Sequence, residues 1–156
     1  MDLNDYLIDQ TGKDWPVLLG GWGTLLPESF DLWLVNRFCD LFVVPADGSV
    51  HFLDVGGCVI TRVADSRSQF ATKLDEGDNA NIWLMIPLVD ACVATGLLPG
   101  KNQCYGYKVP PVLGGAYQIG NVELTDLAVH YGLLADIHAQ TKDLPDGTKI
   151  RRVVIR

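Results

Sequence analysis

The stretch LFVVPADGSVHFLDVGGCVITRV, residues 41–63, decides the fold. Two β-rich runs, at 41–44 and 50–55, flank the turn sequence Pro-Ala-Asp-Gly at 45–48. An Asp-Gly pair between two apolar runs is among the strongest hairpin signals that a sequence can carry. A Gly-Gly bend then leads into a third β-rich run at 58–63. The stretch therefore predicts three sequential strands that pair antiparallel.

Helical patterns lie on both sides of these strands. Before them, a proline and an acid at 27–28 suit the first turn of a helix, and apolar residues follow at helical spacing. This pattern predicts a helix over 28–37. After the strands, Ser66 offers an N-cap for a helix that stops near Gly77. A later helix, over 87–95, begins at a proline and is followed by a glycine.

The combination of elements sets the fold class. Helices together with an antiparallel sheet, without repeated strand–helix–strand units, define the α+β class. With no visible linker, we expect a single α+β domain over residues 1–156, an antiparallel sheet with helices packed against it. The remaining predicted elements are a short amphipathic helix before Gly12, a strand over 104–109, a helix from Asn121 to near Gln140, and a terminal strand over 148–155.

Composition narrows the class of protein. Hydrophobic residues make up 48% of the chain, which excludes intrinsic disorder. The net charge is −7, from 19 acidic and 12 basic residues, and most of the acidic excess lies in residues 1–65. An acidic surface repels a phosphate backbone and attracts basic proteins, although ordinary solubility charge produces the same composition. We therefore expect no direct nucleic-acid binding.

Membrane and secretion signals are missing from the sequence. The longest stretch without a charged residue, 109–122, is too short for a membrane span and contains two prolines. Asp2 and Asp5 stand where a signal peptide would be basic. We expect a cytoplasmic protein without a membrane partner.

The four cysteines, Cys39, Cys58, Cys92 and Cys104, show no metal pattern. They form no CxxC pair, and no histidine follows at zinc-ligand spacing. Each has an apolar neighbour in the sequence. We interpret them as reduced core residues and expect neither a metal nor a cofactor.

Catalysis has little support in the sequence. Cys104 could act as a nucleophile with His130 as its base, because such partners need only be neighbours in space. No signature of a thiol enzyme surrounds Cys104, and no serine elbow, distinctive carboxylate pair or cofactor fingerprint is present. We therefore expect no catalytic residue and no enzymatic activity. His130 and the segment 105–107 are predicted to be structural, with His130 buried and hydrogen-bonded to the backbone.

Four segments resemble a known family. They are WLVNRFCDLFVVPADGSVHFLDV (33–55), WLMIPLVD (83–90), CYGYKVPPVLGGAYQIGNVEL (104–124) and KDLPDGTKI (142–150). They are similar to the immunity-protein domain that forms the C-terminal half of type VI secretion DNase immunity proteins, where it often follows a GAD-like domain. The resemblance begins near residue 15, so we expect no room for a GAD-like domain. Cys39 stands where similar sequences usually have glycine.

The resemblance implies a non-enzymatic inhibitor that binds a cognate bacterial toxin, with a basic nuclease domain as the expected partner. Asp75, Glu76 and Asp78 form an acidic cluster between two predicted helices and are our candidate partner-binding residues, although such a cluster can also be a solvated helix end. The N-terminal acids at 2, 5, 9 and 14 are a second candidate. The alternative function is a small-molecule-binding or regulatory domain with a pocket near Cys104, Tyr107 and Gly114.

Overall fold

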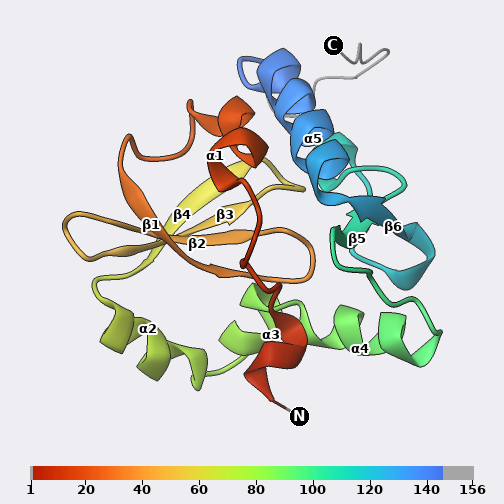
Figure 1. The fold of residues 1–156 in the computed structure, drawn as a ribbon, viewed down its shortest axis with the longest axis horizontal. Helices are drawn as coiled ribbons and strands as arrows, with labels where there is room; N and C mark the ends of the chain where they lie inside the picture. Colours follow the sequence, from red (N-terminus) through yellow and green to blue (C-terminus); the bar gives the residue numbers. More distant parts are fainter. Residues whose placement is uncertain (1, 146–156) are drawn as a thin grey trace.

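The computed structural model describes residues 2–145 and has a four-stranded antiparallel sheet at its centre, in the order β1-β2-β3-β4 (Figure 1). The predicted hairpin and the predicted third strand are confirmed. Across the hairpin, Phe42 pairs with Phe52. The four strands are β1 (Phe30–Val35), β2 (Leu41–Pro45), β3 (Val50–Asp54) and β4 (Val59–Ala64).

The helix predicted over 28–37 is wrong, because this segment forms the edge strand β1. It pairs with β2 through a register that shifts between Leu32 and Leu34. Both faces of β1 are covered, since Phe30 and Leu32 pack against one buried cluster and Trp33 packs against another. A strand covered on both faces lacks the alternation that would reveal it, and pairing with β2 overrides the weak helical spacing.

A second, two-stranded sheet lies beside the last helix. It consists of β5 (Gln103–Tyr107) and β6 (Val122–Asp126), followed by α5 (Leu127–Thr141). The strand predicted over 104–109 is confirmed. The helix predicted from Asn121 begins only at Leu127, because the preceding five residues pair with β5. The predicted terminal strand over 148–155 lies outside the described residues.

The helix predicted after Ser66 is confirmed, and the Ser66 hydroxyl accepts a hydrogen bond from Gln69 N at 3.0 Å. The helix predicted over 87–95 is confirmed within one residue. The expected N-terminal helix is only a single 3₁₀ turn, since Leu7 already bridges to Asn36. The helices besides α5 are α1 (Trp15–Leu18), α2 (Arg67–Leu74), α3 (Asn79–Trp83) and α4 (Ile86–Ala94), with 3₁₀ turns η1 (Leu3–Tyr6), η2 (Gly20–Trp22), η3 (Pro111–Leu113) and η4 (Ile119–Asn121).

The hydrophobic core lies on both sides of the four-stranded sheet, and the fold is α+β as predicted. In Figure 1, α2, α3 and α4 lie along one side of the sheet, and α1 and α5 lie along the other. Trp22 and Tyr131 anchor the cluster beneath α5, and Phe70 and Trp83 anchor the cluster beneath α2 and α3. Within residues 2–145, no helix is long and apolar enough to cross a membrane.

The proline-proline and glycine-glycine segment closes into a tight loop. Asn121 ties its two ends together, because its side-chain amide donates to Val109 O at 2.8 Å and its carbonyl accepts from Val109 N at 2.9 Å. Gly115 N also donates to Pro110 O at 3.1 Å. A Cβ atom on Gly115 would lie far inside the van der Waals radius of Val109 O. Only glycine fits at position 115.

We expect Gly115→Ala to lower the free energy of unfolding by roughly 3 kcal/mol, since the added methyl group must displace backbone. Gly120→Ala is the control, because a Cβ atom at Gly120 meets nothing within 4 Å and the residue has no positive φ. The control should stay within about 0.5 kcal/mol of wild type. Urea unfolding followed by circular dichroism measures both, and equal midpoints for the two variants would contradict the steric explanation.

Candidate functional site

The predicted acidic residues form a short junction between two helices. Asp75 is the C-cap of α2 and Asp78 is the N-cap residue of α3, with Glu76 between them, and all three are exposed. Asn79 holds the junction closed by donating its side-chain amide to Lys73 O at 2.8 Å. None of the ion pairs within the described part of the chain involves these three acids. The junction therefore presents three carboxylates to solvent.

The cavities described here are not lined by Cys104, Tyr107 or Gly114, the residues of the alternative site. Cys104 belongs to the core cluster beneath α5, whereas Tyr107 belongs to the cluster on the other side. Gly114 is exposed in the loop after η3, with a φ of +94°.

Three residues that are distant in the sequence lie close together in the structure, namely Cys39, Cys104 and His130. Their potential metal-binding atoms all lie within 4.8 Å of one another, and all three side chains are buried. A structural zinc site uses four ligands, one more than this group supplies. Burial, together with the neighbouring Cys104, holds the pKa of the Cys39 thiol well above its usual value. A thiol whose pKa is raised by burial, as at Cys39, is a poor nucleophile, so we interpret the group as packing.

The backbone at Cys39 adopts a conformation that favours glycine. Cys39 has a φ of +68°, in the left-handed region that favours glycine. Its carbonyl accepts a hydrogen bond from the Tyr131 hydroxyl at 2.9 Å, which fixes this conformation. A cysteine is tolerated here at the cost of some backbone strain.

The prediction for His130 is confirmed in its geometry. The imidazole is buried, and its Nε2 atom donates to Phe38 O at 3.2 Å. Because a carbonyl only accepts, Nε2 carries the hydrogen. Burial lowers the pKa of His130 to about 4 from 6.5, against the opposing effect of the Phe38 carbonyl. His130 is therefore neutral in the folded protein at neutral pH.

This shift predicts acid sensitivity. Between pH 6.5 and 4 the unfolded chain binds a proton at His130 and the folded chain does not, so stability falls as the pH is lowered through this window. We expect the free energy of unfolding to drop by about 2 kcal/mol between pH 7 and pH 5 through this residue. His130→Gln keeps a hydrogen-bond donor but does not titrate. Urea unfolding at both pH values should show a smaller drop for the variant, and identical drops would contradict the assignment.

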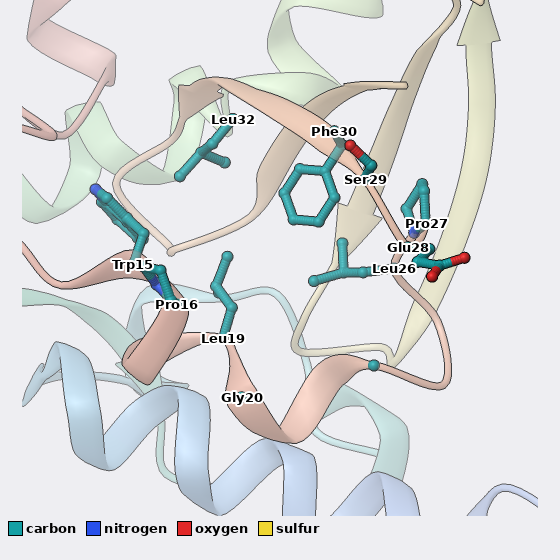
Figure 2. Close-up of a pocket in the computed structure, with 11 residues that line it drawn as sticks. Trp15, Pro16, Leu19, Gly20, Leu26, Pro27, Glu28, Ser29, Phe30 and Leu32 are labelled. Carbon is teal, nitrogen blue, oxygen red and sulfur yellow. The ribbon is translucent and has the colours of Figure 1, made fainter. Parts of the chain in front are cut away.

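The largest cavity described here lies between α1, η2 and β1 and has a volume of about 500 Å³. Figure 2 shows the side chains of Leu19, Leu26 and Phe30 around it. Its walls are mostly apolar, without the convergent polar groups that give a binding site its specificity. The lining residues are Trp15, Pro16, Leu19, Gly20, Gly23, Leu26, Pro27, Glu28, Ser29, Phe30 and Leu32.

A smaller cavity, of about 350 Å³, contains two carboxylates. Asp40 is buried, and burial followed by the charge of Asp54 raises its pKa well above the usual value. Sequence reasoning missed this pair because only the exact register of the hairpin brings Asp40 and Asp54 together. The register of the predicted hairpin could have revealed that these two residues lie opposite each other. Phe52, Ile82, Met85 and Tyr117 complete the lining.

The structure thus describes an α+β domain with enclosed thiols and exposed or cavity-lining carboxylates, which is a chemistry suited to binding. Residues 64–138 match the family model of the C-terminal domain of the type VI secretion system immunity protein Tdi1. The match confirms the resemblance found in the sequence and supports a type VI secretion immunity protein. None of the curated proteins compared with the chain matches it.

Proposed function

We propose that this protein is an immunity protein that binds a nuclease toxin of a type VI secretion system in the cytoplasm and blocks its activity without any catalysis of its own. The observation that carries the proposal is the family match over residues 64–138. The matched segment begins at the end of β4 and ends within α5, so it includes the acidic junction between α2 and α3.

Surface charge supports a nuclease as the partner. Nucleases bind DNA through basic grooves, and an acidic protein can approach such a groove under electrostatic attraction. The α2–α3 junction and the N-terminal acids are all exposed. Tyr6 donates to Asp90 Oδ1 at 2.8 Å, which ties η1 to α4 and places Asp2 and Asp5 beside the layer that carries the junction. The two acidic segments can therefore act on one partner.

Inhibition of the toxin tests the proposal directly. Where a nuclease toxin gene adjoins this gene, the catalytic domain of that toxin is purified, and its cleavage of plasmid DNA is measured with increasing amounts of the protein. We expect cleavage to stop near a one-to-one ratio, and we expect the protein alone to cleave nothing. Full cleavage in the presence of excess protein, together with no detectable binding, would refute the function.

Charge reversal at the junction tests where the partner approaches. The variant is Asp75→Lys, Glu76→Lys and Asp78→Lys, and its control, with the same change in net charge, is Glu123→Lys, Asp126→Lys and Asp143→Lys, all exposed. We expect the junction variant to associate with the toxin at least tenfold more slowly at low salt and with a weaker salt dependence, because steering acts on the association rate. Stopped-flow measurement at two ionic strengths checks this. Equal rates for variant and control would remove the junction from the interface.

A further inference from the structure

The register of the hairpin places two carboxylates opposite each other. Leu41 pairs with Leu53, and Phe42 pairs with Phe52. One residue beyond this register, Asp40 lies opposite Asp54. Because side chains alternate along a strand, both carboxylates share the face of Phe42 and Phe52. Like charges directly opposite each other on one face of a sheet repel.

Within residues 2–145, the hydrogen-bond partners of these carboxylates are neutral groups. Asp40 accepts hydrogen bonds from Val55 N at 3.0 Å and from the Asn36 side-chain amide at 2.9 Å. Asp54 accepts from Gly57 N at 3.0 Å and from the Tyr117 hydroxyl at 2.9 Å. Within residues 2–145, the ion pairs of Arg62 and Arg67 involve other acids. The described part of the chain therefore supplies hydrogen bonds to the pair but no positive charge.

A third polar group near the pair has no hydrogen-bond partner among the described residues. The Tyr107 side chain is 7% exposed, and its hydroxyl makes no hydrogen bond with any described residue. Its ring packs edge-on against Tyr117, with centroids 5.7 Å apart. Burial, followed by the charges of Asp40 and Asp54, raises the pKa of Tyr107. A buried hydroxyl without a partner is rare in folded proteins, so Tyr107 holds an unused polar group within range of the charges of Asp40 and Asp54.

We propose that the cavity lined by Asp40, Asp54 and Tyr117 receives the guanidinium group of an arginine side chain from the toxin. This inference rests on the proposed function and names the chemistry by which the partner is recognised. A guanidinium carries five N–H donors in one plane, enough to reach both carboxylates and the unpartnered hydroxyl of Tyr107. Its positive charge also favours the ionised form of Asp40, which burial and the proximity of Asp54 disfavour in the free protein.

The walls of the cavity favour arginine over lysine or a metal ion. Phe52 and Tyr117 offer aromatic faces, and Ile82 and Met85 are apolar. A guanidinium is weakly hydrated and stacks on aromatic rings, whereas an ammonium group or a divalent cation holds its water strongly. A volume of about 350 Å³ admits an arginine side chain.

The mouth of the cavity adjoins the acidic junction. Ile82 is 59% exposed and Tyr117 is 47% exposed, so both can contact a partner around an inserted side chain. Asp78 precedes Ile82 by four residues at the start of α3, and this spacing places both on one side of the helix. The acidic junction can attract a basic surface toward the cavity. An arginine buried there would contribute a large share of the binding free energy, as buried arginines often do in interfaces.

The first test removes one charge from the cavity. Asp54→Asn keeps the shape of the side chain, and Asp47→Asn is its control, since Asp47 also accepts a backbone hydrogen bond in a turn but lies outside the cavity. Calorimetric titration with the toxin domain should show affinity at least tenfold weaker for Asp54→Asn and within twofold of wild type for the control. Wild-type affinity for Asp54→Asn would overturn the proposal.

A second variant, Tyr107→Phe, shows whether a loss of affinity can occur without a loss of folding. The variant removes a hydroxyl without a partner, so its melting temperature should not fall, while its affinity for the toxin should weaken about threefold or more. Unchanged affinity in this variant would remove Tyr107 from the site and contradict the role given to its hydroxyl.

A toxin-independent measurement separates this inference from the proposed function. N-acetylarginine methylamide is titrated into the isotope-labelled protein, with the corresponding citrulline derivative as a neutral control of the same shape. We expect the arginine probe alone to shift the amide resonances of Gly57, Ile82 and Met85, and Asp54→Asn to abolish the shifts. If the protein binds no toxin and these shifts occur, the proposed function fails and the guanidinium site stands. If the toxin is inhibited and the shifts are absent or equal for both probes, the site is overturned and the function stands.

Discussion

The rest of this structure depends on the hydrogen bonds of the buried side-chain amide of Asn36. Its oxygen accepts hydrogen bonds from Phe38 N at 2.9 Å and Asp40 N at 3.0 Å. Its nitrogen donates to Asp40 Oδ2 and to Trp83 O, both at 2.9 Å. An asparagine amide has two donors and two acceptor sites, so every one is used. The turn between β1 and β2 is thereby fixed and joined to the end of α3, and the same bonds aim Asp40 into the carboxylate cavity.

The turn that Asn36 fixes then serves as a docking point for the second half of the chain. Three consecutive carbonyl groups, at 37, 38 and 39, accept hydrogen bonds from Tyr105 N, His130 Nε2 and the Tyr131 hydroxyl. These donors come from β5 and α5. The two-stranded sheet and the last helix are therefore positioned on the four-stranded sheet through polar contacts of one turn. The hydrogen bond from Tyr131 to the Cys39 carbonyl therefore holds Cys39 in a backbone conformation that glycine adopts more easily.

Local sequence signals predicted the parts of the fold that local physics determines. The Asp-Gly hairpin, the Ser66 cap and the helix bounded by a proline and a glycine depend on residues close in the chain, and the structure has all three. The strands β1 and β6 depend on partners elsewhere, and both were predicted as helix because apolar spacing alone does not reveal pairing. The carboxylate cavity depends on register, since Asp40 and Asp54 meet only when the hairpin aligns them. The cavity combines a hairpin, the α3–α4 junction and a loop, and no single stretch of sequence contains that combination.

Several features around this cavity raise the free energy of the unbound protein. Two carboxylates lie opposite each other, the Tyr107 hydroxyl has no partner among the described residues, and Met85 has a φ of +55°. Unfavourable groups of this kind persist only where surrounding structure holds them, and they gather at functional sites. The Asn36 network and the packed helices α3 and α4 provide that support here. A partner that binds only the folded state stabilises it in proportion to its concentration and affinity. Of these features, the two carboxylates are the groups that the proposed cationic partner satisfies, so replacing them with better-packed residues is expected to stabilise the fold and weaken recognition together.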